Sequence, residues 1–284
     1  MDKTKTIMID GIEFSFNVDK AFEQNGHVYC RKCGERIDSE PLKGMAGVRA
    51  IIYHRQCKCD REREEQRKAE EKAMEIRRMK ERCFETSRNL MNCSFERIDD
   101  PKRKEVVVAK NFVDEFESMY KDNVGLIFHG NAGSGKTYLA ACIANRVIEK
   151  YMVSVKMRNI PEIVNDIETG GFDIDKTEYY NRLANVRLLI LDDFGIERHT
   201  EYVNEMVYQI INTRYEKKRP TIISTNIPIE VIMEGGADIS KERIYSRIRE
   251  MCIPVKVAGV DRRTEIGIQK REANKKKLYK GFER

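Results

Sequence analysis

No apolar run in this 284-residue sequence approaches the length of about 20 residues that a membrane-spanning helix needs. The first residues, MDKTKTIMIDG, also lack the apolar core of a secretory signal peptide. We therefore expect a cytoplasmic protein that has no membrane partner. A chain of this length has room for one substantial core and one smaller module.

Most of the chain also has little net charge of either sign. The formal charge of the whole chain is +6, from 53 Lys and Arg against 47 Asp and Glu. Residues 262–284 carry nine basic residues and three Glu, so this segment alone accounts for that charge. The basic excess belongs to a C-terminal tail, and the overall charge does not by itself predict nucleic-acid binding. A solvated, frayed chain end is an equally good interpretation of the tail.

Disulfides are not expected in a cytoplasmic chain, so the eight cysteines are candidates for metal ligands or buried thiols. Cys30 and Cys33 form a C-x-x-C followed by Gly34, as in a zinc knuckle. Cys57 and Cys59 follow after a 23-residue loop. Four thiolates can coordinate zinc in a tetrahedral site. A module of about 60 residues with few large apolar groups needs such a cross-link for stability.

The second cysteine pair leaves alternatives open. It is a C-x-C, which is tighter than the usual C-x-x-C, so His54 could replace one cysteine and His27 is a weaker substitute. A redox pair or free surface thiols are the alternative to zinc. We expect residues 1–59 to form a zinc-binding module that opens with a β-hairpin around Asp10-Gly11.

A charged segment follows this module. From Asp60 to Arg82, 17 of 23 residues are charged, and the signs alternate. Ala69, Ala73 and Ile76 leave only a narrow apolar strip, which predicts a solvent-exposed helix stabilised by pairs of opposite charge one turn apart. This helix is either a plain linker or a short coiled-coil partner.

The most informative stretch is VGLIFHGNAGSGKT, in which a strand pattern leads into G-x-x-x-x-G-K-T and an amphipathic helix. Its glycines allow successive backbone N–H groups to turn toward an anion. Lys136 is placed for the β- and γ-phosphates, and Thr137 offers a hydroxyl to Mg²⁺. A glycine-rich turn with an incidental lysine does not explain this context. The predicted nucleotide-binding residues of this loop are Gly130, Asn131, Ala132, Gly133, Ser134, Gly135, Lys136, Thr137 and Tyr138.

A second strand pattern, VRLLILDDFG, ends in two carboxylates. It is typical of a Walker B element, with Asp192 beside Thr137 to hold Mg²⁺ through water and Asp193 to orient the attacking water. Ligands of α/β proteins bind at the carboxyl ends of such strands. The next strand pattern, TIISTN, places Asn226 to contact the γ-phosphate or the water, although a turn-forming Asn is the alternative.

Taken together, these elements resemble the AAA+ ATPases of the bacterial helicase-loader group, DnaC and DnaI, and the related transposition ATPase IstB. The resemblance runs from about residue 92 to residue 263, roughly 60 % of the chain. Its motifs are NCSF at residues 92–95, GNAGSGKT, LLILDDFG, the segment from NTRY through KRP to STN at residues 212–226, and ERIYSR at residues 242–247. The resemblance implies an α/β fold, a P-loop AAA+ core with a parallel sheet flanked by helices.

The resemblance also implies roles for individual residues. Asn226 would be sensor 1, and Arg247 looks like the arginine finger that enters a neighbouring subunit's ATP site. Arg243 is an alternative finger only if the alignment is displaced by one helical turn. Arg263, or with less support Arg262, resembles the sensor 2 arginine.

Two features depart from the broader AAA+ pattern. Asp193 stands where most members have Glu, and a carboxylate that is one methylene shorter predicts slow basal hydrolysis, which suits a switch. Only a brief helical segment separates Asn226 from the last predicted strand, which indicates that the AAA+ lid is absent or much reduced.

We expect four segments: a zinc-binding module at 1–59, a charged linker helix at 60–91, an AAA+ core at 92–266 and a basic tail at 267–284. The expected cofactors are ATP, Mg²⁺ and Zn²⁺.

The resemblance implies a DNA replication protein that loads the replicative DNA helicase onto single-stranded DNA as a homo-oligomer, with ATP hydrolysis as the switch. By resemblance to DnaI, the zinc module would dock on the helicase. One alternative is an IstB-type transposition ATPase that binds duplex DNA and a transposase. Another is a DNA-binding adaptor that binds ATP without hydrolysing it.

Overall fold

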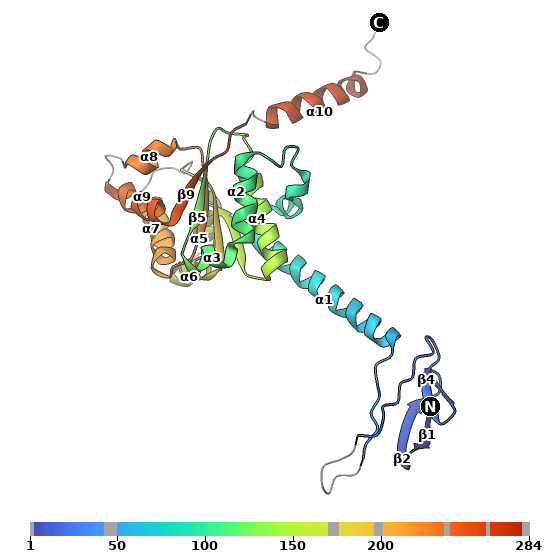
Figure 1. Ribbon diagram of the computed structural model, residues 1–284. Helices are drawn as coiled ribbons and strands as arrows, with labels where there is room; N and C mark the ends of the chain where they lie inside the picture. The colour runs from blue at the N-terminus through green and yellow to red at the C-terminus, as the bar shows by residue number, and fades with distance from the viewer. Residues whose placement is uncertain are drawn as a thin grey trace. The chain divides into compact units, whose positions relative to one another are not determined.

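The protein, seen here as a computed structural model, forms two compact units, Met1–Glu75 and Ile76–Arg284 (Figure 1). We describe each unit by itself. The structure describes residues 3–42, 50–169, 176–195, 201–235, 239–259 and 262–279. None of the helices in these ranges combines the length and the apolar character that crossing a membrane requires.

The first unit contains two antiparallel β-hairpins. Its strands are β1 (Thr4–Ile9), β2 (Ile12–Asn17), β3 (Ala21–Gln24) and β4 (His27–Cys30). Two-residue turns, Asp10-Gly11 and Asn25-Gly26, join the strands, and all four turn residues have positive φ, as tight hairpin turns of this kind require. The first hairpin confirms the sequence prediction. The second was missed, although Asn-Gly is itself a strong hairpin signal.

The hydrophobic core of this unit is small. Among its described residues, five side chains are buried together: Ile9, Phe14, Phe16, Ala21 and Val28. A core of this size contributes little stability, so the unit needs an additional cross-link.

Helix α1 (Lys58–Cys83) covers most of the predicted charged linker. Ion pairs one turn apart lie along its surface, as between Arg77 and Glu81, whose closest atoms are 3.1 Å apart. The C-terminal end of the helix belongs to the second unit, because Ile76 packs against that unit's core and Cys83 is fully buried in it. The helix is therefore solvent-exposed over most of its length and anchored at its end.

The second unit is organised around a five-stranded parallel sheet with the strand order β6-β7-β8-β5-β9 (Figure 1). The strands are β5 (Gly125–His129), β6 (Val155–Asn159), β7 (Leu188–Phe194), β8 (Thr221–Thr225) and β9 (Cys252–Lys256). Three of them, β5, β7 and β8, lie within the segments VGLIFHGNAGSGKT, VRLLILDDFG and TIISTN, in which the sequence predicts strands. The predicted parallel α/β fold is confirmed.

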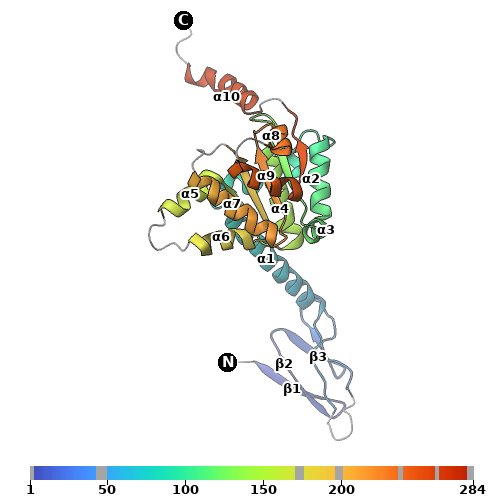
Figure 2. The same cartoon turned by 90° about the vertical axis from the view of Figure 1, so that its left-hand side faces the viewer.

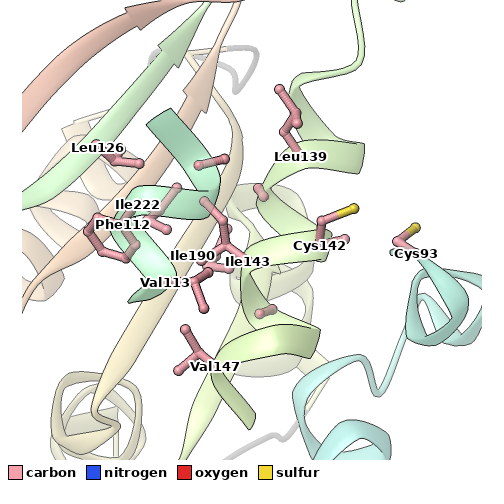
Figure 3. Close-up of a cluster of buried hydrophobic side chains, with 14 of the residues drawn as sticks. Cys93, Phe112, Val113, Leu126, Leu139, Cys142, Ile143, Val147, Ile190 and Ile222 are labelled. Atoms are coloured by element: carbon pink, nitrogen blue, oxygen red, sulfur yellow. The ribbon is translucent and has the colours of Figure 1, made fainter. Parts of the chain in front are cut away.

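Helices cover both faces of this sheet (Figures 1 and 2). Leu188 and Ile190 of β7 are buried on one face and Leu189 and Leu191 on the other, as the two-residue period of a strand requires. The first face packs against α2 (Lys104–Asp114) and α4 (Lys136–Tyr151), whose side chains fill the cluster in Figure 3. The second face packs against α5 (Ile160–Thr169), α6 (Lys176–Asn185), α7 (Glu201–Glu216) and α9 (Ile239–Met251).

The segments around β9 differ in detail from the prediction. Two helices, α8 (Ile229–Glu234) and α9, separate β8 from β9, where the sequence predicts one brief helical segment. Beyond β9, the described residues form a single helix, α10 (Arg262–Leu278). This helix crosses the predicted boundary between core and tail at residue 266, so most of the basic tail is helical.

Candidate nucleotide-binding site and metal centre

The glycine-rich loop lies between β5 and α4, at the carboxyl edge of the sheet. Gly130 has a φ of 148°, and a Cβ added there would lie 2.4 Å from the carbonyl oxygen of Val257. Gly135 has a φ of 102° immediately before the 16-residue helix α4. Glycine is required at both positions, and the loop directs the positive amino end of α4 toward the site.

Lys136 lies at the centre of this site. Its side chain is buried, and Nζ donates hydrogen bonds to the carbonyl oxygens of Gly130 (2.9 Å) and Asn131 (2.8 Å). Nζ also donates to Oδ1 of Asn226 at 2.7 Å, from the residue that follows β8. The structure thus brings the predicted loop lysine and the predicted sensor 1 residue into direct contact.

The two carboxylates at the end of β7 face the same loop. Oγ1 of Thr137 donates to Oδ1 of Asp192 at 3.0 Å, and the hydroxyl of Ser224 on β8 donates to the same carboxylate oxygen. Burial raises the pKa of Asp192, and the neighbouring charge of Asp193 raises it further. A hydroxyl and a carboxylate are the hard oxygen ligands that Mg²⁺ prefers, so Thr137 and Asp192 fit the predicted magnesium site.

A cavity of about 550 Å³ opens beside the loop. This volume lies within the range of small-molecule sites. Asp193 and Asn226 line it together with the loop, whereas Asp192 is not part of the lining and accepts a hydrogen bond from Thr137, which is part of it. The rest of the lining comes from residues 132–139 and from five residues that the sequence analysis did not identify: Leu90, Arg97, Ile98, Arg103 and Val106.

The segment that contributes these residues is held in place by α4. The hydroxyl of Tyr138 donates to the carbonyl oxygen of Ser94 at 3.2 Å. Nδ2 of the buried Asn145 donates to the carbonyl oxygens of Leu90 and Cys93, both at 2.9 Å. The NCSF motif therefore packs along α4, where it borders the cavity. Such a contact depends on tertiary packing, so no local sequence pattern could have predicted it.

Four cysteine sulfurs come together in the first unit. The Sγ atoms of Cys30, Cys33, Cys57 and Cys59 all lie within 4.8 Å of one another. A tetrahedral site with Zn–S bonds of about 2.3 Å has sulfurs about 3.8 Å apart, so small side-chain adjustments would complete it. Gly34, with a φ of 71°, forms the turn after the first pair, and the second pair lies at the start of α1.

The electrostatic surroundings of these sulfurs differ. Backbone N–H groups, first that of Glu35 and then that of Cys59, lower the pKa of Cys33 to about 6, which favours the thiolate that binds metals. Burial raises the pKa of Cys57 to about 12. Among the described residues, the cluster consists of the four cysteines and no histidine. His54 instead hydrogen-bonds the Ser15 carbonyl oxygen at 2.8 Å.

A comparison with known protein families agrees with the arrangement of the glycine-rich loop. The family described as IstB-like ATP binding protein matches residues 57–263, which is 207 of the 284 residues. The chain belongs to this family. It is thus a member of a family of P-loop proteins that bind ATP, which agrees with the loop geometry above.

Several relatives of this IstB-like chain are named replicative helicase loaders. DnaI of Bacillus subtilis is 25 % identical over 255 residues, which cover 83 % of this chain and 78 % of DnaI. DnaC of Escherichia coli is 29 % identical over 163 residues, and DnaC of Buchnera aphidicola from Baizongia pistaciae is 30 % identical over 164 residues. The chain covers 63 % and 64 % of these two DnaC proteins, less than two thirds of their length.

Solved structures show the same similarity. A crystal structure of DnaI matches with a TM-score of 0.52 and 26 % identity over 62 % of this chain and 93 % of that one. A crystal structure of the DnaC helicase loader matches with a TM-score of 0.51 and 25 % identity over 60 % of this chain and 99 % of that one. The fold of the second unit is thus that of the DnaC and DnaI group.

Arg247 lies apart from the cavity of its own chain. Its guanidinium donates to Oδ1 of Asn212 at 2.7 Å, to the hydroxyl of Tyr208 at 3.1 Å and to the carbonyl oxygen of Arg243 at 2.9 Å. The guanidinium carbon also lies 4.8 Å from the Tyr208 ring centroid. The side chain is half-buried and held by α7, so it is oriented without occupying the site described above.

The two candidates for sensor 2 lie at the start of α10. Arg262 and Arg263 are the first two residues of α10, and their side chains lie outside the part of the chain that the structure describes. Arg243, the alternative finger, is exposed on α9 one turn before Arg247.

Proposed function

We propose that this IstB-family chain is an ATPase that loads a replicative DNA helicase onto single-stranded DNA, with hydrolysis acting as the switch. The observation that carries the proposal is the alignment with DnaI. The alignment covers 83 % of the chain, whereas the second unit, residues 76–284, makes up about three quarters of it. The similarity to a named helicase loader therefore extends beyond the nucleotide-binding unit into the cysteine-containing unit.

The nucleotide part of the proposal follows from the contacts of Lys136. The loop N–H groups and the amino end of α4 bind the phosphates, and Lys136 binds the β- and γ-phosphates. Because Nζ of Lys136 also contacts Asn226 at 2.7 Å, a γ-phosphate bound by this lysine would lie close to the proposed sensor residue. Thr137 and Asp192 hold Mg²⁺, which when bound neutralises charge on the phosphate oxygens.

Hydrolysis requires an oriented water and a cation near the γ-phosphate. Asp193, which lines the cavity, orients the water. Arg247 of a neighbouring subunit supplies the cation, which fits its location outside its own chain's cavity and its anchoring by Asn212 and Tyr208. A finger of this kind contributes ~10³–10⁵ in rate. Its delivery by a neighbour makes hydrolysis depend on assembly.

The remaining parts of the proposal concern partners. Four thiolates of the first unit hold Zn²⁺, and this unit docks on the helicase. Basic residues of the assembled second units bind the phosphate backbone of single-stranded DNA, with affinity that falls steeply as salt increases. Arg263, or Arg262 in its place, acts as sensor 2.

A transposition ATPase of the IstB type is the competing proposal, because the family match itself covers IstB-like proteins. It is less well supported, since a relative whose alignment covers 83 % of this chain is named a helicase loader. The two proposals differ in their protein partner and in the form of DNA that is bound.

A pull-down distinguishes them. The full-length chain, loaded with a slowly hydrolysed ATP analogue, is mixed in separate reactions with the host's replicative helicase and with a transposase from the same genome. We expect the helicase to be retained, and Lys136→Ala to reduce retention because nucleotide no longer orders the assembly. Retention of the transposase and loss of the helicase would overturn the loader proposal and favour the IstB-type one.

A further inference from the structure

One buried hydroxyl contacts both Walker B residues, although the motif does not include it. Ser224 is fully buried on β8, and its Oγ donates a hydrogen bond to Oδ1 of Asp192. The same Oγ accepts the backbone N–H of Asp193 at 3.0 Å. One serine hydroxyl thus serves as a donor to the first carboxylate and as an acceptor for the backbone of the second.

The backbone around these contacts is irregular. β7 and β8 pair in regular register up to Leu191 and Ile223, and pairing resumes at Phe194 and Thr225. Two residues of β7 therefore lie opposite one residue of β8, which is the arrangement of a β-bulge. The bulge consists of Asp192 and Asp193, and the residue opposite is Ser224.

A bulge disturbs backbone hydrogen bonding and side-chain direction together. Asp193 has a φ of 51°, in the left-handed region that few residues other than glycine occupy. Its N–H points to the hydroxyl of Ser224. A backbone N–H that is removed from water and has no partner is destabilising, so the serine side chain stabilises a backbone conformation that the strand alone disfavours.

The two carboxylates therefore occupy different positions. Oδ1 of Asp192 accepts hydrogen bonds from Thr137 and Ser224, which fixes the rotation of this carboxylate beside the loop. Asp193, one residue later, lines the cavity instead. In a regular strand, adjacent side chains point to opposite faces of the sheet, so the bulge is what allows Asp192 to contact Thr137 while the next residue, Asp193, lines the cavity.

We infer that Ser224 is a positioning residue for the ATPase reaction: it holds the β-bulge that presents Asp192 to Mg²⁺ and Asp193 to the attacking water. This inference rests on the proposed function. It concerns a residue that does not line the cavity and acts through the two aspartates. Residues of this kind change metal affinity or activity by about 10- to 100-fold when their hydrogen bond is removed.

The first test uses hydrogen exchange on the full chain without nucleotide. In the wild type, the Asp193 amide is expected to be protected, although it faces a side chain and not a strand backbone. Ser224→Ala should increase its exchange at least about tenfold, since a lost hydrogen bond of roughly 1.4 kcal/mol is a factor of ten. An Asp193 amide that exchanges in the wild type as fast as an exposed amide would overturn the inference.

A matched control lies at the other end of β7. Oγ of Ser154 accepts the backbone N–H of Arg187 at 3.1 Å, so Ser154→Ala removes the same kind of bond away from the site. Ser224→Ala should lower kcat and raise the Mg²⁺ concentration needed for half-maximal turnover by about 10- to 100-fold, with KM for ATP changed less than about threefold. Ser154→Ala should leave all three values unchanged.

The outcomes separate this inference from the proposed function. If Asp192→Ala abolishes turnover and Ser224→Ala behaves as Ser154→Ala does, the positioning role is wrong while the ATPase proposal stands. If the wild type shows no turnover beyond that of Lys136→Ala, the ATPase proposal fails, and Mg²⁺-dependent binding of a fluorescent ATP analogue then tests Ser224. Equal Mg²⁺ dependence of that binding in Ser224→Ala and the wild type would again contradict the inference.

Discussion

Arg214 offers a sharp test of how the second unit is held together, because it is a fully buried cation. Nε donates to Oγ1 of Thr221 at 2.8 Å, and Nη1 donates to the carbonyl oxygens of Ala184 (3.1 Å) and Val186 (3.0 Å). Nη2 donates to the carbonyl oxygen of Pro220. The guanidinium thus joins α7, the C-terminal end of α6 and the start of β8, and it satisfies helix-end carbonyls that would otherwise lack donors.

Arg214→Lys is the informative change, since it keeps a long basic side chain and replaces the planar guanidinium by a single ammonium group. Burial lowers the pKa of Arg214 to about 9, so the buried charge carries a desolvation cost that its hydrogen bonds offset. A lysine ammonium is a single donor group, and it cannot reach the oxygens near Pro220 and those at the end of α6 at the same time. Losing two charge-assisted hydrogen bonds at about 1.5–3 kcal/mol each predicts a loss of ~3–6 kcal/mol in the free energy of unfolding.

A neutral replacement should do less harm than the lysine. Arg214→Met also loses the hydrogen bonds, but it removes the buried charge, so its free energy of unfolding should lie between those of Arg214→Lys and the wild type. Arg77→Lys, on the exposed surface of α1, is the control and should change stability by less than about 0.5 kcal/mol.

The assay is urea unfolding followed by far-ultraviolet circular dichroism, which suits a chain without tryptophan. Hydrogen exchange in the peptides that contain residues 176–186 and 221–225 locates the effect. Equal stability of Arg214→Lys and Arg77→Lys, or a lysine variant more stable than the methionine variant, would refute this reasoning.

Three further predictions concern the sites. Replacing Cys30 and Cys57 together by Ser should release zinc and unfold the first unit while the second melts as before; a zinc assay that finds no metal in the parent protein would remove the basis for this. Arg247→Ala should retain ATP binding and lose turnover by about 10³-fold or more, and mixing it with Lys136→Ala should restore activity; failure at every mixing ratio would exclude a shared site. Because the pKa of Asp192 is raised in the folded state, the stability linked to this carboxyl is present at low pH and lost as pH rises through that pKa. Asp192→Asn should therefore keep or increase thermal stability at neutral pH while abolishing the Mg²⁺ dependence of nucleotide binding, and a marked loss of stability would contradict this.

Local patterns predicted several of the residues that meet at the candidate site. Glycines with a required backbone conformation, a lysine at fixed spacing and a strand that ends in aspartates are short-range features, and the structure brings Lys136, Thr137, Asp192 and Asn226 together. The strands of the second unit were predictable for a similar reason. They are short apolar runs with polar boundaries, and strands of parallel sheets are buried on both faces.

Features that depend on tertiary contacts were missed. One such feature is helix α6, which the sequence analysis did not predict. Arg214 stabilises its C-terminal end by donating hydrogen bonds to the carbonyl oxygens of Ala184 and Val186, about 30 residues earlier in the sequence. The cavity wall formed by Leu90, Ile98 and Val106 depends on packing against α4. Ser224 belongs to an ordinary strand pattern, and its role depends on a bulge in the neighbouring strand. Single-sequence patterns carry no information about such partners.

The most direct test of the account is ATP turnover by the full-length chain, measured with Mg²⁺ and compared with Lys136→Ala and Asp192→Ala. The account predicts slow, Mg²⁺-dependent release of phosphate by the wild type, with both variants reduced to background. Turnover that is the same in all three proteins would contradict the claim that ATP is bound and hydrolysed between the glycine-rich loop and the end of β7.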